Sequence, residues 1–344
     1  MSISTNAYSI RCMTAFRGKV GLRIGDYDSP DPYFASSNLK ALNYLRHMMA
    51  YGPVTGLVLD VGPLWPLEHH GGLPFRSTEL WVRNEKNKEV LQYLPSAEQA
   101  KVLAFVRHTD AKLCLGSCLL KRRAISEACG VPWSDITISE DGNRKPCYQP
   151  TDPSSKAFEF NVSHHGSVVA LVGCVGEDLK LGVDVVRVDM EKDYPKVLRE
   201  GFESWARTYE AVFSDRETED IINYTPSGTM SSNDQVRAKL RHFYAHWCLK
   251  EAYVKMTGEA LMAKWLRQVE FRNVKVPAAS SADPWGEVCT QVEVWANGKR
   301  VDDVTLHIQA FREDYMLAVC ASTPNVVTNF QLLEPENDIY PRAH

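Results

Sequence analysis

Residues 247–258 read Trp-Cys-Leu-Lys-Glu-Ala-Tyr-Val-Lys-Met-Thr-Gly and close a segment with helical periodicity. We expect this helix to span about residues 234–256 and to end near Gly258. Glu251 lies on or beside its apolar stripe, and Lys255 follows one turn later on the same face. A pair at this spacing is also common as a surface ion pair, so the helix alone does not identify a functional site.

Three other side chains of this predicted helix are assigned no functional role. Lys250 is expected to point about 100° away from the face that carries Glu251 and to meet solvent. His242 and His246 are four residues apart, as in the zinc-binding helix of metalloproteases, but Phe243 stands where that motif has its glutamate. We therefore expect both histidines to be ordinary helix residues.

A second carboxylate interrupts an apolar segment. Residues 181–186 read Leu-Gly-Val-Asp-Val-Val, which predicts a buried strand. Asp184 is costly in such a strand unless it is paired, hydrogen-bonded or bound to a cation. Two interpretations remain open: a strand-end aspartate that accepts backbone N–H groups, or a ligand of a cation.

A polar notch lies within the apolar, β-branched run of residues 158–175. Its sequence, at 161–166, is Asn-Val-Ser-His-His-Gly. Adjacent residues of an extended chain point to opposite faces, so Ser163 and His164 are not expected to form a nucleophile–base pair. Anion binding by one of the histidines fits better, and a solvated turn is the alternative.

Two further groups of cations stand out. Residues 142–148 read Gly-Asn-Arg-Lys-Pro-Cys-Tyr, so Lys145 directly precedes Pro146, which fixes the backbone at the start of a strand. The other group, Arg107, His108 and Lys112, falls on a predicted helix. Each group taken alone is an ordinary solvated run of charges.

The order of predicted elements indicates an α+β fold. Helix followed by strands occurs twice, near residues 78–178 and 179–325, although no sequence repeat relates the two segments. The first half is expected to open with a short strand at residues 80–82. We divide the chain into a poorly ordered N-terminal extension with little core of its own, a first half, a second half with the candidate metal site, and a tail: 1–76, 77–178, 179–325 and 326–344.

Composition excludes several classes of protein. The net charge of −4 over 344 residues gives no basic field for nucleic acid, and no apolar run reaches the length of a membrane helix. Nine scattered cysteines indicate free thiols in a reducing compartment, so we expect a cytoplasmic protein. We also expect it to be a monomer. The first 25 residues lack Asp and Glu but contain basic residues, so a mitochondrial transit segment is the alternative.

In combination and in this order, the motifs resemble those of the surfactin-synthetase-type (Sfp-type) 4′-phosphopantetheinyl transferases. The resemblance covers about residues 78–325 and comprises Gly-x-x-Lys-Pro, Asn-Val-Ser-His-x-Gly, Gly-Val-Asp and the stretch at 247–258. Residues 158–164, residues 250–253 with 256–261, and residues 265–266 look particularly like the fungal members. The resemblance implies a pseudo-twofold pair of similar α+β halves with coenzyme A in the cleft between them.

The resemblance also implies a reaction and roles for residues. The phosphopantetheine arm of coenzyme A would pass to a serine of a carrier protein, with Mg²⁺ bound and 3′,5′-ADP released. Asp184 and Glu251 match the Mg²⁺ ligands, and Glu251 also matches the proposed general base. Lys255 and His164 match pyrophosphate contacts, and Lys145 matches a contact to the nucleotide. The other candidates for binding coenzyme A are Pro146, Ser163, Lys112 and Arg107.

One position departs from the pattern. Many bacterial relatives carry a glutamate two residues after the motif aspartate as a third Mg²⁺ ligand, and this chain has Val186 there. We expect a water to replace that ligand, since Mg²⁺ readily keeps waters. A third carboxylate from Glu159 or Asp189 would overturn this expectation.

The resemblance names partners, and two rival functions stay open. Fungal relatives commonly serve carrier domains of polyketide synthases, peptide synthetases, fatty-acid synthase and the aminoadipate reductase of lysine biosynthesis. One rival is another Mg²⁺-dependent nucleotide phosphotransferase or a pyrophosphatase, although the chain has no Gly-x-x-x-x-Gly-Lys-Ser/Thr loop. The second rival is a non-catalytic relative that binds coenzyme A or a carrier protein.

Overall fold

A computed structural model describes most of the chain from residue 54 onward. The chain divides into two units after residue 42. Every described residue belongs to the second unit, Asn43–His344. The described residues are 54–68, 76–142, 145–148, 150, 152, 156–176, 178–188, 190–228, 230–259, 263, 265–334 and 338–341. No helix within these ranges is both long and apolar enough to cross a membrane.

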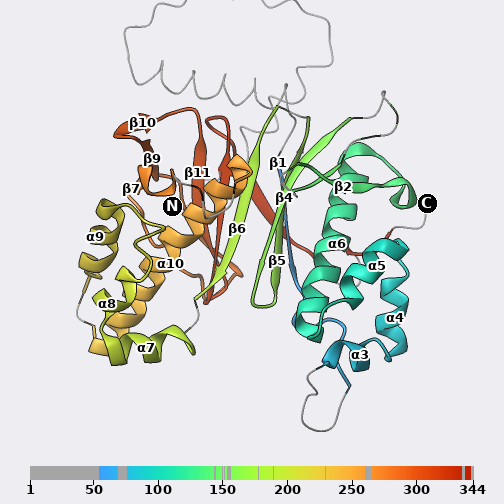
Figure 1. Cartoon of the computed structure of the whole chain (residues 1–344), viewed down its shortest axis with the longest axis horizontal. Helices are drawn as coiled ribbons and strands as arrows, with labels where there is room; N and C mark the ends of the chain where they lie inside the picture. Colours follow the sequence, from blue (N-terminus) through green and yellow to red (C-terminus); the bar gives the residue numbers. More distant parts are fainter. Residues whose placement is uncertain are drawn as a thin grey trace, which may run out of the picture. The chain divides into compact units, whose positions relative to one another are not determined.

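The first half is built on a six-stranded sheet whose strand order is β13-β1-β5-β4-β3-β2. Its strands are β1 (Val54–Asp60), β2 (Ile138–Glu140), β3 (Pro146–Tyr148), β4 (Phe158–His165), β5 (Val168–Val175) and β13 (Thr328–Leu332). Its helices are α3 (Ser77–Trp81), α4 (Glu85–Leu91), α5 (Ser96–Leu103) and α6 (His108–Cys129), with a short 3₁₀ turn at Trp133–Asp135. The long helix α6 packs on β5, β4 and β1 and buries Leu115 and Leu119 against them (Figure 1).

Strands β1 and β13 correct the boundaries expected for the first half. β1 lies inside the segment predicted to be an extension, and β13 lies inside the predicted tail. β1 pairs with β5 on one side and with β13 on the other, and Val58 and Leu59 are completely buried. This short strand has its partners far away in the sequence, so local periodicity did not reveal it. Residues 1–53 lie outside the described residues.

The strand expected at residues 80–82 is also wrong. Residues Ser77–Trp81 form the short helix α3, and the side chain of Trp81 is completely buried. Its indole nitrogen donates a hydrogen bond to the carbonyl oxygen of Trp65 at 2.8 Å. Burial of this ring against the loop after β1 favours the helix, and a three-residue apolar run carries too little periodicity to separate the two conformations.

The second half contains a four-stranded sheet of order β6-β12-β11-β8 and a three-stranded sheet of order β10-β9-β7. The strands are β6 (Leu181–Arg187), β7 (Val269–Arg272), β8 (Trp285–Cys289), β9 (Glu293–Ala296), β10 (Lys299–Val301), β11 (Thr305–Phe311) and β12 (Tyr315–Ala321). The helices are α7 (Asp193–Glu200), α8 (Phe202–Arg207), α9 (Asp215–Asn223) and α10 (Ser232–Thr257), with a 3₁₀ turn at Leu266–Gln268. Helices α7–α10 lie on one side of β6, β4 and β5, and α3–α6 lie on the other (Figure 1). The predicted α+β class is confirmed.

The long helix α10 begins and ends as its sequence predicts. The side chain of Ser231 accepts a hydrogen bond from the backbone N–H of Asp234, and Gly258 adopts the left-handed conformation with a φ of 78°. α10 packs against β6 and β12 (Figure 1). At Gly182 of β6 the helix backbone comes so close that an added Cβ would overlap the carbonyl oxygen of Ala252. This glycine therefore allows α10 to lie directly over β6.

The two halves meet where β4 lies beside β6. These strands belong to different sheets, and side chains of alternate β4 residues bridge them. The backbone N–H of Val183 donates to the side-chain oxygen of Asn161 at 2.9 Å, and that of Arg187 donates to Nδ1 of His165 at 3.0 Å. Ser163, between them, takes part in the candidate site.

Candidate functional site

Asp184, Ser163 and Lys255 come together at this junction. The ammonium of Lys255 lies 2.6 Å from Oδ1 of Asp184 and donates a hydrogen bond to Oγ of Ser163 at 2.8 Å. Oγ of Ser163 in turn donates to the same Oδ1 at 2.8 Å. Asp184 is only 5% exposed, so a cation and a hydroxyl compensate its buried charge. The structure therefore unites residues that lie up to 92 positions apart in the sequence.

Glu251 lies one turn before Lys255 on α10 and is half-buried. Burial raises the pKa of its carboxyl to about 7, and the negative charge of Asp184 adds to this rise, while Lys255 opposes it. Asp184 and Glu251 therefore lie close enough to repel each other electrostatically. A carboxyl with a pKa near neutrality can accept a proton at physiological pH.

His164 is exposed, on the strand face opposite to that of Ser163, as the alternation of strand residues predicts. Partial desolvation lowers the pKa of His164, and the positive charge of Lys255 lowers it further. The negative charge of Asp110, in the first turn of α6, acts in the opposite direction. His164 therefore senses charges from both halves, namely those of Lys255 on α10 and Asp110 on α6.

The two cationic candidates on α6 have different environments. Lys112 is buried and donates a hydrogen bond to the carbonyl oxygen of Gly62, beyond β1, at 2.9 Å. Desolvation lowers the pKa of Lys112, and the nearby Asp60 counteracts this. Arg107 is exposed at the residue before α6. Binding of a phosphate by either residue stays a prediction, and for Lys112 it would have to accompany or replace the bond to Gly62.

Lys145 forms an ion pair with Glu159 of β4, and its backbone N–H donates to the side chain of Asp141 at 2.9 Å. Pro146 begins β3, as expected for a residue that fixes the start of a strand. Glu159, which was one possible third carboxylate of a metal site, is thus engaged by Lys145. Asp189, the other possibility, lies outside the described residues.

Comparisons with known proteins match two consecutive stretches of the chain. Residues 81–176 match the model of a 4′-phosphopantetheinyl transferase N-terminal domain, and residues 180–320 match that of the 4′-phosphopantetheinyl transferase superfamily. A 4′-phosphopantetheinyl transferase of Aureobasidium melanogenum is 32% identical, over 83% of this chain and 96% of its own length. The chain belongs to the 4′-phosphopantetheinyl transferase superfamily.

Two further relatives of this transferase are informative. The 4′-phosphopantetheinyl transferase A of Aspergillus fumigatus is 34% identical over 67% of this chain and 77% of its own length. The L-aminoadipate-semialdehyde dehydrogenase-phosphopantetheinyl transferase of Xenopus laevis is 29% identical over 51% of this chain and 52% of its own length. The higher identities to fungal proteins confirm the predicted resemblance to the fungal members.

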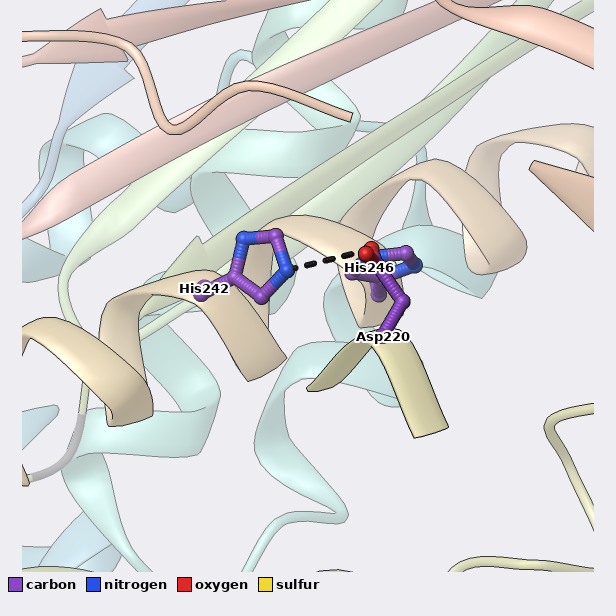
Figure 2. A group of neighbouring side chains, drawn as sticks. All are labelled: Asp220, His242 and His246. Carbon is purple, nitrogen blue, oxygen red and sulfur yellow. Dashed lines mark hydrogen bonds and ion pairs between the residues drawn. The ribbon is translucent and has the colours of Figure 1, made fainter. Parts of the chain in front are cut away.

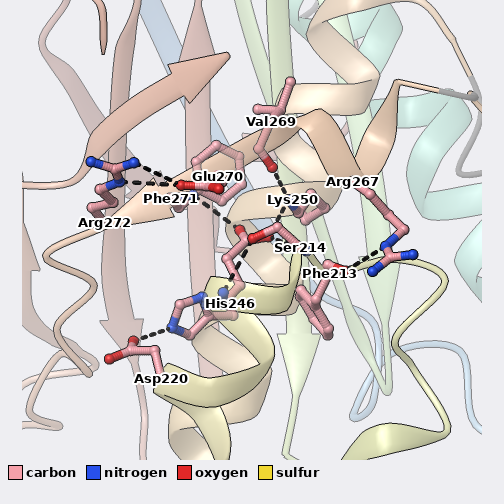
Figure 3. A network of polar contacts seen from close by, with 11 residues as sticks. Phe213, Ser214, Asp220, His246, Lys250, Arg267, Val269, Glu270, Phe271 and Arg272 are labelled. Carbon is pink, nitrogen blue, oxygen red and sulfur yellow. Dashed lines mark hydrogen bonds and ion pairs between the residues drawn. The ribbon is translucent and has the colours of Figure 1, made fainter. Parts of the chain in front are cut away.

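The prediction that Lys250 meets solvent is wrong. Its side chain is completely buried and forms an ion pair with Glu217 of α9 at 2.8 Å, instead of meeting solvent. Its ammonium also donates to the carbonyl oxygen of Val269 (Figure 3). Glu217 accepts a second hydrogen bond, at 3.0 Å, from the backbone N–H of Phe271. This buried pair ties α10 to α9 and β7 at the residue before Glu251.

Sequence reasoning missed Glu217, although a local pattern marks it. Ser214 and Glu217 form a reciprocal capping box at the start of α9, which is a recognisable Ser-x-x-Glu motif. The capping box predicts the helix start but not the partner of Lys250. Only the packing of α9 against α10 reveals that this glutamate also neutralises a buried lysine.

Proposed function

We propose that this transferase moves the 4′-phosphopantetheine arm of coenzyme A onto a serine of a carrier protein, releases 3′,5′-ADP and requires Mg²⁺. The observation that supports this most directly is the cluster of Asp184, Ser163 and Lys255 beside Glu251, at the junction of the two halves. Transfer of a phosphoryl group depends mainly on charge neutralisation and positioning, and a cluster of two carboxylates and a lysine provides both.

Asp184 and Glu251 are the residues that would hold Mg²⁺. Their carboxylates are the oxygen ligands that this ion prefers. Burial raises the pKa of Glu251, the negative charge of Asp184 raises it further, and a divalent cation would relieve that repulsion. When bound, Mg²⁺ neutralises charge on the pyrophosphate of coenzyme A. The donor set at this site therefore fits the ion.

Val186 leaves this site with two protein carboxylates. It lies two residues after Asp184 on β6, is 2% exposed and belongs to the apolar core beneath α10. A valine offers no ligand atom, so waters and phosphate oxygens would complete the coordination of Mg²⁺. Some loss of metal affinity relative to a site with three carboxylates is the expected consequence.

The other residues act on the substrate. Lys255 would donate hydrogen bonds to the pyrophosphate. The exposed His164, whose pKa is lowered in part by the charge of Lys255, would donate to the same group from its ring N–H. Glu251, whose pKa is raised to about 7, would accept the proton of the attacking serine directly or through a water. Ser163 is buried against Asp184 and Lys255, so we assign it the role of orienting these two rather than of contacting coenzyme A.

The partners proposed are carrier domains of polyketide synthases, peptide synthetases and fatty-acid synthase. Relatives named for L-aminoadipate-semialdehyde dehydrogenase support a carrier domain of aminoadipate reductase as well. We further propose that the enzyme acts as a cytoplasmic monomer. The eight cysteines within the described ranges form no disulfide, which is compatible with a reducing compartment.

Intact-mass measurement of an apo carrier protein tests the proposal. The carrier is incubated with the enzyme, coenzyme A and Mg²⁺, and a gain of one phosphopantetheine is expected, with none in excess chelator. Cleavage of coenzyme A in the absence of carrier would instead favour a nucleotide phosphotransferase or a pyrophosphatase. Binding of coenzyme A with neither cleavage nor transfer would favour a non-catalytic binding protein.

A further inference from the structure

A second cluster of ligand-type side chains lies where α9 packs on α10. Asp220 of α9 faces His242 and His246 of α10, and the Nε2 atoms of both histidines approach the same carboxylate oxygen, Oδ2, at 3.3 and 3.1 Å (Figure 2). The three potential ligand atoms all lie within 4.8 Å of one another. Two imidazole nitrogens and a carboxylate oxygen thus converge on one point.

Packing fixes the orientation of both rings. His242 is 2% exposed and His246 is completely buried, whereas the Asp220 side chain is 57% exposed. The ring of Tyr224 stacks on His242 with centroids 4.0 Å apart, and the ring of Phe213 meets His246 edge-on. Burial lowers the pKa of His242 and so favours the neutral imidazole, the form that binds metals. The rings are therefore held with Nε2 toward Asp220.

We propose that Asp220, His242 and His246 bind one divalent transition-metal ion, Zn²⁺ or a close equivalent, through both Nε2 atoms and a carboxylate oxygen. Imidazole nitrogen suits such ions, whereas Mg²⁺ prefers oxygen ligands. Three protein ligands with one open position are a common arrangement for zinc. A cavity of about 450 Å³ borders Asp220, whose side chain is 57% exposed to solvent. This site is separate from the one assigned to Asp184 and Glu251.

The metal would add a second link between the helices that the Lys250–Glu217 pair already joins. Glu217 and Asp220 lie one turn apart on α9. His246 and Lys250 lie one turn apart on α10 (Figure 3). The ion would therefore stabilise the packing of α9 on α10, the helix that carries Glu251. Its role is structural, and the expected result is a higher melting temperature of the enzyme.

The surroundings of the His242 and His246 rings limit the affinity of the proposed site for Zn²⁺. Within the part of the chain that the structure describes, the buried Nδ1 atoms of His242 and His246 have no hydrogen-bond partner. Metal-binding histidines usually donate this second N–H to an acceptor, and loss of such a partner weakens binding about 10- to 100-fold. We therefore expect Zn²⁺ to bind less tightly than at a structural zinc site with a complete outer shell.

Titration of the chelator-treated full-length chain with Co²⁺ and Zn²⁺ tests the site. The double variant Asp184→Ala/Glu251→Ala serves as background, because it lacks the carboxylates of the other candidate site. We expect one equivalent of Co²⁺ with visible absorption typical of nitrogen and oxygen ligands, displaced by Zn²⁺. Absence of binding would overturn the proposal, and so would thiolate-to-metal absorption, which would point to cysteines.

Matched variants on α9 locate the ion. Asp220→Asn is expected to weaken binding by at least about tenfold. Glu219→Gln removes the neighbouring carboxylate, which instead contacts Arg207 and Asn223, and should leave the affinity unchanged. His246→Gln should abolish the rise in melting temperature with Zn²⁺. Equal affinities of Asp220→Asn and Glu219→Gln would contradict the assignment.

X-ray absorption of the zinc-loaded, unmutated enzyme gives a result that does not depend on the folding of any variant. Scattering from two imidazole rings is expected around the ion. A first shell that contains sulfur, or one without imidazole, would overturn the proposal. Loss of all zinc from the enzyme on gel filtration would also reject the site. It would show that Asp220, His242 and His246 make only hydrogen bonds.

Discussion

At the scale of single residues, Asp184 accepts hydrogen bonds from Ser163 and Lys255, and its charge acts on Glu251. We predict that Asp184→Asn and Glu251→Gln each lower the transfer rate at least about 100-fold, because each removes a ligand for Mg²⁺ and charge from the site of phosphoryl transfer. Carrier mass measures the rate, and circular dichroism checks the fold. Near wild-type transfer by both folded variants would show that the metal assignment is wrong.

The two lysines should differ in their kinetic effects. Lys255→Ala should mainly lower kcat, because Lys255 is assigned to the reacting pyrophosphate. Lys145→Ala should mainly raise the KM for coenzyme A, because Lys145 is assigned to the remote nucleotide. Steady-state kinetics with a fixed carrier separates the two. If both substitutions change kcat and KM in the same proportions, the division of roles is refuted.

The carboxyl of Glu251 predicts a dependence of stability on pH in the absence of Mg²⁺. Its pKa rises from 4.5 to about 7 on folding, so the folded protein binds more protons than the unfolded chain between these values. Its contribution therefore makes stability fall as pH increases from about 4.5 to 7. The loss should be about 1–3 kcal/mol after allowance for solvent screening.

Urea unfolding of wild type and Glu251→Gln in chelator, at several pH values, measures this contribution. The variant lacks the titrating group, so the difference in unfolding free energy between the two proteins should follow the predicted slope. Added Mg²⁺ should flatten the dependence of this difference on pH, since a cation favours the ionised carboxyl. A difference that stays constant from pH 4.5 to 7 would exclude the raised pKa.

At the scale of secondary-structure elements, the approach of α10 to β6 determines where Glu251 and Lys255 lie. An alanine at position 182 would place its Cβ against the backbone of Ala252, so α10 would have to shift. Gly182→Ala should cost about 1–3 kcal/mol of stability and reduce transfer. Gly142→Ala is a matched control, because an added Cβ there has no atom within 4 Å. Thermal melts and transfer assays that rank the two variants equally would contradict this account.

At the scale of the whole molecule, β1 joins segments from both ends of the chain. It pairs with β5 and with β13, and its removal would leave backbone N–H and C=O groups of both strands unpaired. A chain that begins at residue 77 is therefore expected to aggregate, whereas one that begins at residue 50 keeps β1. Solubility and gel filtration compare the two. A soluble, active chain 77–344 would show that β1 is dispensable.

The sequence by itself determined the family and the main local elements. The motif at 247–258 predicted α10 with its end at Gly258, and the apolar run at 181–186 predicted the buried strand β6. The family resemblance also holds. These features depend on periodicity, capping and short motifs, which a linear sequence displays completely.

Only the tertiary structure decided which distant side chains meet. Lys250 was expected in solvent, and its partner Glu217 on α9 makes its burial possible. Asp220 brings together two histidines that looked ordinary on their helix, and β13 completes a sheet around β1. The physical reason is the same in each case. Burial of a charge or of a strand edge is favourable only when a partner from another element satisfies it, and periodicity carries no information about that partner.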